Sequence, residues 1–498
     1  MDVNFQKNYR SCMNVVVQEI QNSEQTQEIK LTEGMPDIGR ILSAWGQPIL
    51  RSKEWGSDTL SFTGGMMVWV LYAPEDGSQE RCLEGWIPFQ MRWDLPEEVP
   101  EGRMRLRLLP RLVDARSVSP RKILVRAGMG AMAEAFVPAE IPESTPDTVP
   151  EGVELLKTTY PFRLMKEAGE KAFIMDENLV LPESAPQPEQ IVYYRADPRV
   201  TDRKVLSEKV VFRGNTGLHL LYRSVEGQLH SWDFDLPFSQ YAELSGEYGS
   251  EAQADFAMCP TSMELELDEQ GHLRFKCGIT AQYCITDREQ LTMVEDAYSP
   301  NRELTIHTEP AEIPAVLENR RETLYAEQSI PAEVNLAADV AFLPDFPRQK
   351  YREGGVELEQ PGVFQTLYYG ENGALQAGSA RWDGALSLNA GSNVRVAAVP
   401  QPSMPTAAIG SGQLSMKAEL PVELISTANQ YIPVVSGLAL GEERKPDPGR
   451  PSLILRRAGE NSLWEIAKAS NSTVSSIREA NGLQNEPAPG QMLLIPVL

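Results

Sequence analysis

The sequence predicts a mainly β protein made of tandem sandwich-like repeats of about 150 residues, followed by a small C-terminal βααβ domain. Three observations lead to this expectation. They are an internal repeat at a fixed offset, apolar runs that end in hairpin turns, and a change to helical signals after residue 451. Helical periodicity is poor before that residue, so strands dominate the expected fold.

The repeat is visible in three segments. Residues 60–72 (LSFTGGMMVWVLY) match residues 210–222 (VVFRGNTGLHLLY) at an offset of 222 − 72 = 150. A third segment, 356–368 (VELEQPGVFQTLY), lies 368 − 222 = 146 further on and has Gln360 at the place of Gly64. Solenoid repeats recur every 20–50 residues, so this longer period predicts one domain per copy. We expect the third, degenerate copy to pair its strands less regularly.

Each apolar run is followed by two residues that favour a hairpin turn, because glycine adopts the left-handed backbone that such turns need. The pairs are Asp76-Gly77, Glu226-Gly227 and Asn372-Gly373. Proline-rich joints separate the copies. The sequence therefore predicts β domains at residues 8–149, 150–299 and 300–440, a polar linker at 441–450 and a last domain at 451–498.

The last domain begins with a strand and a helix. Residues 452–455 form a short apolar run that suits a strand, and Gly459 ends it. Asn461 or Ser462 can cap a helix, since their side chains accept hydrogen bonds from the first backbone amides. The inward face of this helix would hold Leu463, Ile466 and Ala467.

A second helix and a strand complete the pattern. Ser472 or Thr473 can cap the helix, and the Asn481-Gly482 pair can end it in a left-handed conformation. Pro489-Gly490 predicts a turn before a closing strand at residues 492–497. The inward positions of this helix would be Val474, Ile477 and Ala480.

This order of signals resembles the LysM family over the whole of residues 451–498. LysM modules usually bind chitin-like or peptidoglycan glycan in a groove between the loop after the first strand and the loop before the second. The family commonly has Gly-Asp-Thr or Gly-Asp-Ser in the first loop, where this chain has residues 459–462 (GENS). The resemblance implies a partner- or glycan-binding site made of Gly459, Glu460, Asn461, Ser462, Trp464, Asn481, Gly482, Leu483, Pro489 and Gly490.

Charge and cysteine content limit the partners and the compartment. The chain has 46 Lys and Arg against 70 Asp and Glu, a net charge of -24, which disfavours nucleic acid and anionic membranes as partners. We find no secretory signal at the start and no apolar run long enough to span a membrane. The five cysteines are odd in number and scattered, as is typical of a reducing compartment. The sequence therefore predicts a cytoplasmic protein.

The repeats show a second resemblance. Residues 171–182, 201–214 and 236–240 are similar to the SPOCS domain of clostridial spore-associated proteins, and residues 87–89 (IPF) correspond to 236–238 (LPF). Tandem SPOCS-type copies followed by a terminal LysM module resemble the SipL-like spore morphogenetic proteins. The resemblance implies a scaffold in the mother-cell cytoplasm at the forespore surface. In that family the LysM module binds a coat-basement morphogenetic ATPase (SpoIVA-like) rather than glycan.

The sequence contains no strong motif for catalysis, phosphate binding or metal binding. None of the four histidines has a metal-ligand spacing, and residues 126–130 (RAGMG) lack the Lys-Ser/Thr of a phosphate loop. A zinc set involving Cys259 is disfavoured, and Asp233 with Asp235 is better explained as a solvated strand face than as a catalytic pair. No Gly-x-Ser-x-Gly elbow is present. We expect no catalytic residues, no metal and no cofactor.

Three functions stay open at this stage. The first is a non-enzymatic scaffold of the endospore envelope; the alternative is a protein that binds peptidoglycan or chitooligosaccharide; the third is a wall hydrolase, which lacks a catalytic set. Trp464 can either shield the small core or contact a partner, because an aromatic ring stacks on a sugar as readily as it anchors a protein contact. Protein and glycan therefore remain alternative ligands of the LysM module.

Overall fold

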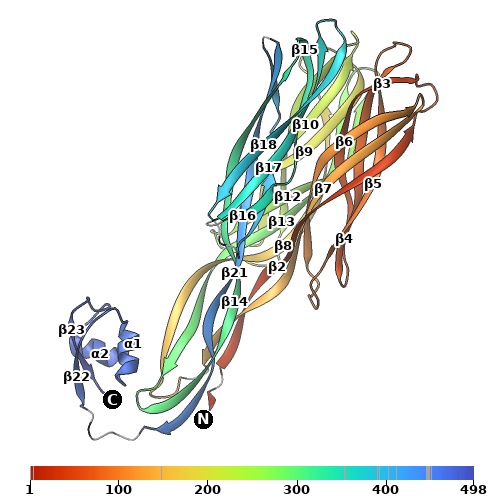
Figure 1. Ribbon diagram of the computed structural model, residues 1–498. Helices are drawn as coiled ribbons and strands as arrows, with labels where there is room; N and C mark the ends of the chain where they lie inside the picture. The colour runs from red at the N-terminus through yellow and green to blue at the C-terminus, as the bar shows by residue number, and fades with distance from the viewer. Residues whose placement is uncertain are drawn as a thin grey trace.

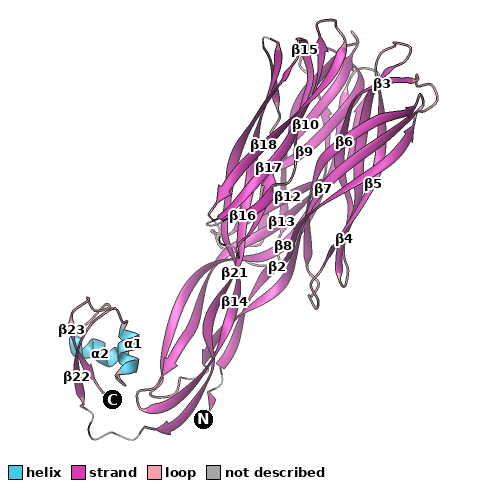
Figure 2. Cartoon of the chain, viewed as in Figure 1, coloured by secondary structure: helices cyan, strands magenta, loops and turns pink. Residues whose placement is uncertain are grey.

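The structure is a computed structural model and describes residues 2–3, 5–146, 149–352, 355–389, 391, 393–401, 403–410, 412–444, 449 and 451–498. Long antiparallel strands fill the part before residue 444, and two short helices lie near the C-terminus (Figure 2). This confirms the predicted fold class. Of the predicted linker, residues 445–448 and 450 lie outside the described residues.

The first strand set contains six strands in two antiparallel sheets. One sheet has the order β3-β4-β5 and the other β2-β7-β6. In β5, Ile87, Phe89, Met91 and Trp93 are buried and the residues between them are exposed, which is the period of two expected when one sheet face covers a core. The strands are β2 (Phe5–Lys30), β3 (Ile38–Trp55), β4 (Thr59–Pro74), β5 (Arg81–Asp94), β6 (Arg103–Ser119) and β7 (Lys122–Pro146).

The second strand set repeats this arrangement. One sheet has the order β9-β10-β11. The strands β8-β13-β12 form the end of an eight-stranded sheet, which continues into the third strand set where Leu164 pairs with Ala315. The strands are β8 (Glu154–Leu179), β9 (Pro188–Leu206), β10 (Lys209–Ser224), β11 (Leu229–Glu243), β12 (Gln253–Leu267) and β13 (Leu273–Tyr298).

The third strand set has the same plan with two interruptions. β15 and β16 both pair with β17, and β19 and β20 both pair with β21, where the other sets have one continuous strand. The prediction of less regular pairing is thus confirmed. The strands are β14 (Arg302–Pro331), β15 (Val334–Pro344), β16 (Arg348–Arg352), β17 (Gly355–Gly370), β18 (Leu375–Leu388), β19 (Arg395–Pro400), β20 (Thr406–Gly410) and β21 (Gln413–Glu443), and the short β1 (Asp2–Val3) joins β21.

One substitution accounts for the first interruption. In the second set, a Cβ atom at Gly214 would lie 1.8 Å from the carbonyl oxygen of Arg199, so only glycine lets the facing strand pass, and Gly64 has the same role in the first set. The third set has Gln360 at this position. Its amide donates to the carbonyl oxygen of Asp345 at 2.6 Å, in the gap between β15 and β16. The side chain thus lies where the strand is broken.

The predicted hairpin turns are all present. Gly77, Gly227 and Gly373 have φ of 71°, 88° and 70°, and they lie in the β4–β5, β10–β11 and β17–β18 turns. A side chain is rarely tolerated at these angles, so the three glycines define the turns.

The first and last strands of each set form a long ribbon, and the three ribbons meet at one end of the molecule. β2 pairs with β7, β8 with β13, and β14 with β21 along nearly their whole length. Their ends form a stalk, defined by the apolar core of Cys12, Phe162, Leu291, Ile313 and Ile432 (Figure 1). All three ribbons contribute to that core, so none of them buries its apolar face alone.

The strand sets also share cores outside the stalk. Trp45 and Trp69 of the first set lie against Tyr193 and Tyr194 of the second, with Trp45 stacked on Tyr193 at 4.9 Å between ring centroids. Leu367 of the third set belongs to the same buried cluster. The three sets therefore form one packed body.

Candidate functional site

The C-terminal module (residues 451–498) is a two-stranded antiparallel sheet packed on two helices, as predicted. Its elements are β22 (Leu453–Arg457), α1 (Leu463–Ala469), α2 (Val474–Asn481) and β23 (Met492–Pro496). The buried residues are Ala458, Leu463, Ile466, Ala467, Ile477, Leu493 and Ile495, together with Tyr298 from β13.

The local sequence sets both helix ends. Ser462 and Glu465 form a capping box, in which the backbone amide of Glu465 donates to the Ser462 hydroxyl and the amide of Ser462 donates to the Glu465 carboxylate. Thr473 caps α2, and Gly482 ends it with φ of 62°, as predicted. Ala480 is exposed, so its predicted inward position is wrong. It lies in the last turn, three residues beyond the buried Ile477.

The two predicted loops lie next to each other. The backbone amide of Leu463 donates to the Glu486 carboxylate at 3.0 Å, and the amide of Gly490 donates to the carbonyl oxygen of Ala458 at 2.7 Å. The first backbone amides of a helix have no partner within the helix, and here the Glu486 side chain takes one of them. The predicted residues that are exposed are Gly459, Glu460, Asn461, Ser462, Gly482, Pro489 and Gly490.

Asn481 makes structural contacts within the module. Its amide nitrogen donates to the carbonyl oxygens of Ile477 at 2.8 Å and Leu494 at 2.6 Å, and its oxygen accepts from the amide of Leu494 at 2.7 Å. Asn481 therefore joins α2 to β23. Leu483 is half-buried against the core of the module.

The face of α1 that bears Trp464 packs on the end of the stalk. The indole Nε1 of Trp464 donates to the Asp296 carboxylate at 2.8 Å, and Lys468 Nζ lies 2.7 Å from the same carboxylate. The rings of Trp464 and Tyr298 meet edge to face at 4.7 Å. Burial raises the pKa of the Tyr298 hydroxyl, which donates to the carbonyl oxygen of Ser472 at 2.9 Å. Trp464 is therefore an intramolecular anchor.

Sequence reasoning missed this contact. The repeat offset of 150 places Pro146 at the position of Asp296, so the second ribbon departs from the first at this point. That departure was the available signal. It does not indicate which surface the Asp296 side chain contacts.

Replacing Asp296 with alanine should weaken the contact between module and stalk by about 1–2 kcal/mol, because one partly exposed ion pair and one hydrogen bond are lost. We expect faster amide hydrogen exchange at residues 464–472 in the full chain. Glu309→Ala, an exposed carboxylate on β14, is the control and should leave exchange unchanged. Equal exchange in both variants would show that Asp296 does not hold the module.

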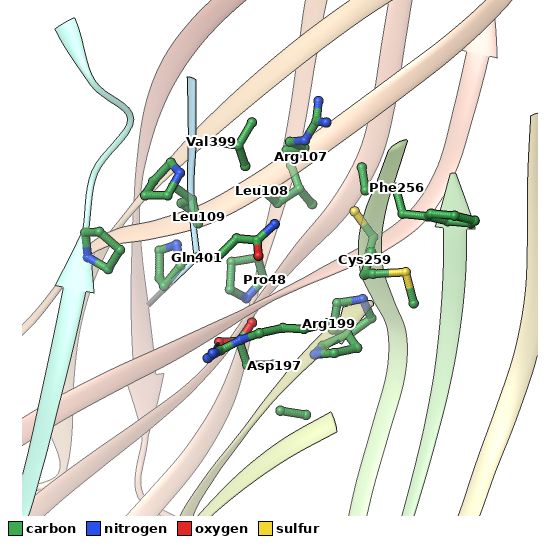
Figure 3. A pocket seen from close by; sticks show the side chains of 18 of the residues that line it. Pro48, Arg107, Leu108, Leu109, Asp197, Arg199, Phe256, Cys259, Val399 and Gln401 are labelled. Carbon is green, nitrogen blue, oxygen red and sulfur yellow. Dashed lines mark hydrogen bonds and ion pairs between the residues drawn. The ribbon is translucent and has the colours of Figure 1, made fainter. Parts of the chain in front are cut away.

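A cavity of about 140 Å³ lies where the three strand sets meet (Figure 3). It is lined by equivalent prolines at the repeat offset: Pro48 and Pro198 are 198 − 48 = 150 residues apart, and Pro344 follows after 344 − 198 = 146. Pro110, Pro260 and Pro400 also line it, with spacings of 260 − 110 = 150 and 400 − 260 = 140 residues. The cavity thus marks an approximate threefold arrangement of the sets.

Two ion pairs lie among the charged side chains of this cavity. Arg199 lies 2.5 Å from Asp197, and Arg203 lies 3.5 Å from Glu423. Burial raises the pKa of the Cys259 thiol to about 11, so it is a poor nucleophile near neutral pH. Arginine does not exchange protons at such pH. Burial and, after it, the charge of Asp255 raise the pKa of the Glu423 carboxyl on the cavity wall.

His219 connects the second and third strand sets. Its Nδ1 lies 2.6 Å from Asp233 and its Nε2 lies 2.8 Å from Asp339 of β15, and the imidazole is 4% exposed. Burial opposes its protonation, but the charge of Asp339 and the bonds to both carboxylates raise the pKa of His219 to about 9. Asp233 thus neutralises a buried imidazolium, while Asp235 accepts a hydrogen bond from Asn215 at 2.8 Å.

The raised pKa predicts an alkaline loss of stability. The contribution of His219 is fully present below its ordinary pKa of 6.5 and is lost as pH rises through about 9. We expect the free energy of unfolding to fall by up to about 3 kcal/mol across this range. Urea unfolding from pH 7 to pH 10 should show a shallower fall in His219→Gln. His272→Gln, at an exposed site, should behave as wild type; identical slopes in all three would contradict the assignment.

A metal centre or a membrane-spanning helix would point to other functions. No three His, Cys, Asp or Glu side chains in this part of the chain are placed to hold a metal ion. No helix among the same residues has the length and apolar character to cross a bilayer.

Comparisons with known proteins identify two segments. Residues 187–265, within the second strand set, match the family model for the SipL SPOCS domain. Residues 457–496 match the LysM domain model. No curated protein and no solved structure matches the chain.

Proposed function

We propose, from the premise that this chain is a SipL-like protein with a SPOCS domain and a C-terminal LysM domain, that it is a non-enzymatic scaffold of the bacterial endospore envelope. The observation that carries the proposal is the presence of both domains in one chain, which makes it a sporulation-related LysM protein. SPOCS and LysM are non-catalytic binding or scaffold domains. The scaffold would lie in the mother-cell cytoplasm at the forespore surface.

A protein ligand is favoured over glycan by the loops of the LysM domain. The backbone amides of Ser462 and Leu463 donate to the carboxylates of Glu465 and Glu486, so these two donors are already used within the domain. Glu486 also adds a negative charge between the loops, at 3.7 Å from Arg478. We infer that the exposed loop residues contact a coat-basement morphogenetic ATPase (SpoIVA-like), the partner that the resemblance to SipL-like proteins suggests.

The β region supports the proposal because its three strand sets can offer several binding surfaces at once. We propose that the three strand sets are the predicted domains at 8–149, 150–299 and 300–440, and that each offers an acidic face to other coat proteins. When several weak binding surfaces lie on one rigid body, the first contact raises the effective concentration of the partners for each further contact. Coat and cortex assembly would then become cooperative.

Copurification from sporulating cells tests the proposed function. The tagged full chain should retain the coat-basement ATPase, identified by mass spectrometry. Asn461→Arg should reduce the recovered amount by about tenfold or more, because a large side chain at a contact centre excludes the partner. Asn178→Arg, at an exposed site of β8, is the matched control. Full recovery with Asn461→Arg, or no ATPase with wild type, would contradict the proposal.

A second candidate is binding of peptidoglycan, which the LysM match itself favours. Cosedimentation with purified sacculi distinguishes it, since the scaffold reading predicts that the full chain stays in solution. Pelleting that Asn461→Arg abolishes would support glycan binding instead.

A further inference from the structure

The outer face of the LysM sheet is apolar and uncovered. Leu455 pairs with Leu494 and Leu453 with Pro496, so these side chains share one face, while Ile495 points to the core. The exposed fractions are 51% for Leu453, 65% for Leu455, 47% for Met492 and 37% for Leu494. α1 packs on the stalk, and the sheet lies on the other side of the module (Figure 1). The stalk therefore leaves this face free.

Exposed leucines are unremarkable singly but are informative when they gather on one face. The core of the module, which includes Ile466, Leu493 and Ile495, lies on the opposite side of the sheet, so this face is not part of it. A sheet with one apolar face normally buries that face against another layer. Here no layer of the described residues lies over it.

The charged side chains beside the apolar sheet face indicate the kind of partner that covers it. Arg457 pairs with Met492 on this face, and Arg456 precedes it with an exposed side chain. Neither arginine makes an ion pair within the described part of the chain. The carboxylates of Glu465 and Glu486 are already used in the loops. An apolar surface bordered by carboxylates would match both features of the face.

We propose that the apolar sheet face, Leu453, Leu455, Met492 and Leu494 with Arg457, is a second contact surface of the LysM domain, for a partner protein whose docking surface is apolar with an acidic border. This rests on the proposed protein-docking function and adds a surface outside the loops. The LysM domain would then contact its partner through both the loops and the sheet.

Other occupants fit less well. A second copy would bring the same arginines from the other side, with no carboxylate on the face to receive them. Leucine and methionine offer no flat aromatic ring on which a sugar could stack.

Photocrosslinking in sporulating cells tests the surface without assuming the partner. The full chain would carry p-benzoylphenylalanine at Leu455, or at Val180, which is 84% exposed outside the module, as the control. We expect the probe at Leu455 to crosslink to a peptide of another protein that contains apolar residues together with Asp or Glu. The probe at Val180 should not give this adduct. An adduct with a second copy or with lipid, or no adduct at all, would overturn the proposal.

Binding of the purified full chain to the crosslinked protein gives the second readout. Leu455→Glu and Arg457→Glu should each weaken binding by about tenfold, and Val180→Glu should not change it. If the crosslinked protein is not the coat-basement ATPase, the proposed partner fails and the surface stands. If the ATPase binds wild type and Leu455→Glu equally, the surface fails and the proposed function stands.

Discussion

Replacing Glu134 with alanine is expected to destabilise the β region by about 3–5 kcal/mol, because it leaves buried charge without a partner. The Glu134 carboxylate accepts from Arg105 Nε at 2.7 Å and from Nη2 at 2.9 Å, and it also pairs with Arg107. Arg105 and Arg107 both reach Asp255 of the second strand set. In the variant, the two guanidinium groups would share the single carboxylate of Asp255.

The first transition in urea unfolding of the full chain measures this loss of stability. Glu140→Ala, an exposed carboxylate on the same strand, is the control and should cost less than about 0.5 kcal/mol. Burial opposes ionisation of Glu134, but the charges of Arg105 and Arg107 lower its pKa below the ordinary 4.5. Its contribution is therefore present above that pH and is lost on acidification. A loss below about 1 kcal/mol would mean that water reaches the cluster.

Replacing Trp69 with alanine is the second change with a large expected effect. Trp69 is 2% exposed, and its ring lies 5.2 Å from Tyr193 and 5.1 Å from Tyr194, edge to face. Removing a buried indole costs about 3–5 kcal/mol. Because these tyrosines belong to β9, we expect the second strand set to lose stability together with the first.

Hydrogen exchange read by peptide distinguishes a shared core from independent domains. The Trp69→Ala variant should exchange faster in both β4 and β9, whereas Trp232→Ala, at a 37% exposed site, should change neither. Faster exchange confined to residues 38–94 would show that the first set is an independent folding unit. Unfolding in one step would agree with a single packed body.

The sequence was sufficient where local chemistry decides the structure. The glycines of the three hairpin turns require a left-handed backbone, and the capping box at Ser462 with the stop at Gly482 defines the two helices. The substitution at Gln360 signalled the interrupted strand of the third set. Each of these features is set by residues that are neighbours in sequence or by the repeat itself.

What the sequence could not provide is the packing between copies. Arg105 and Asp255 are 150 positions apart, and their meeting depends on how two strand sets are oriented. His219 reaches Asp339 for the same reason. The periodicity shows which face of a strand is apolar, but not which sheet of another copy covers it.

The candidate site was predictable in part. The loops at residues 459–462 and 482–490 have the expected position, and most of their predicted residues are exposed. The contact of Trp464 with Asp296 required coordinates, because the two residues are 168 positions apart, and the contact of Asn481 with Leu494 depends on how α2 packs on β23. Binding by the ten predicted residues stays a prediction.

Isothermal titration of the purified full chain tests the central claim, that the LysM domain binds a protein of the spore coat rather than glycan. We predict saturable heat with the purified coat-basement ATPase, reduced by Asn461→Arg, and no heat with peptidoglycan fragments. Saturable binding of the glycan fragments, with none to the ATPase, would contradict it.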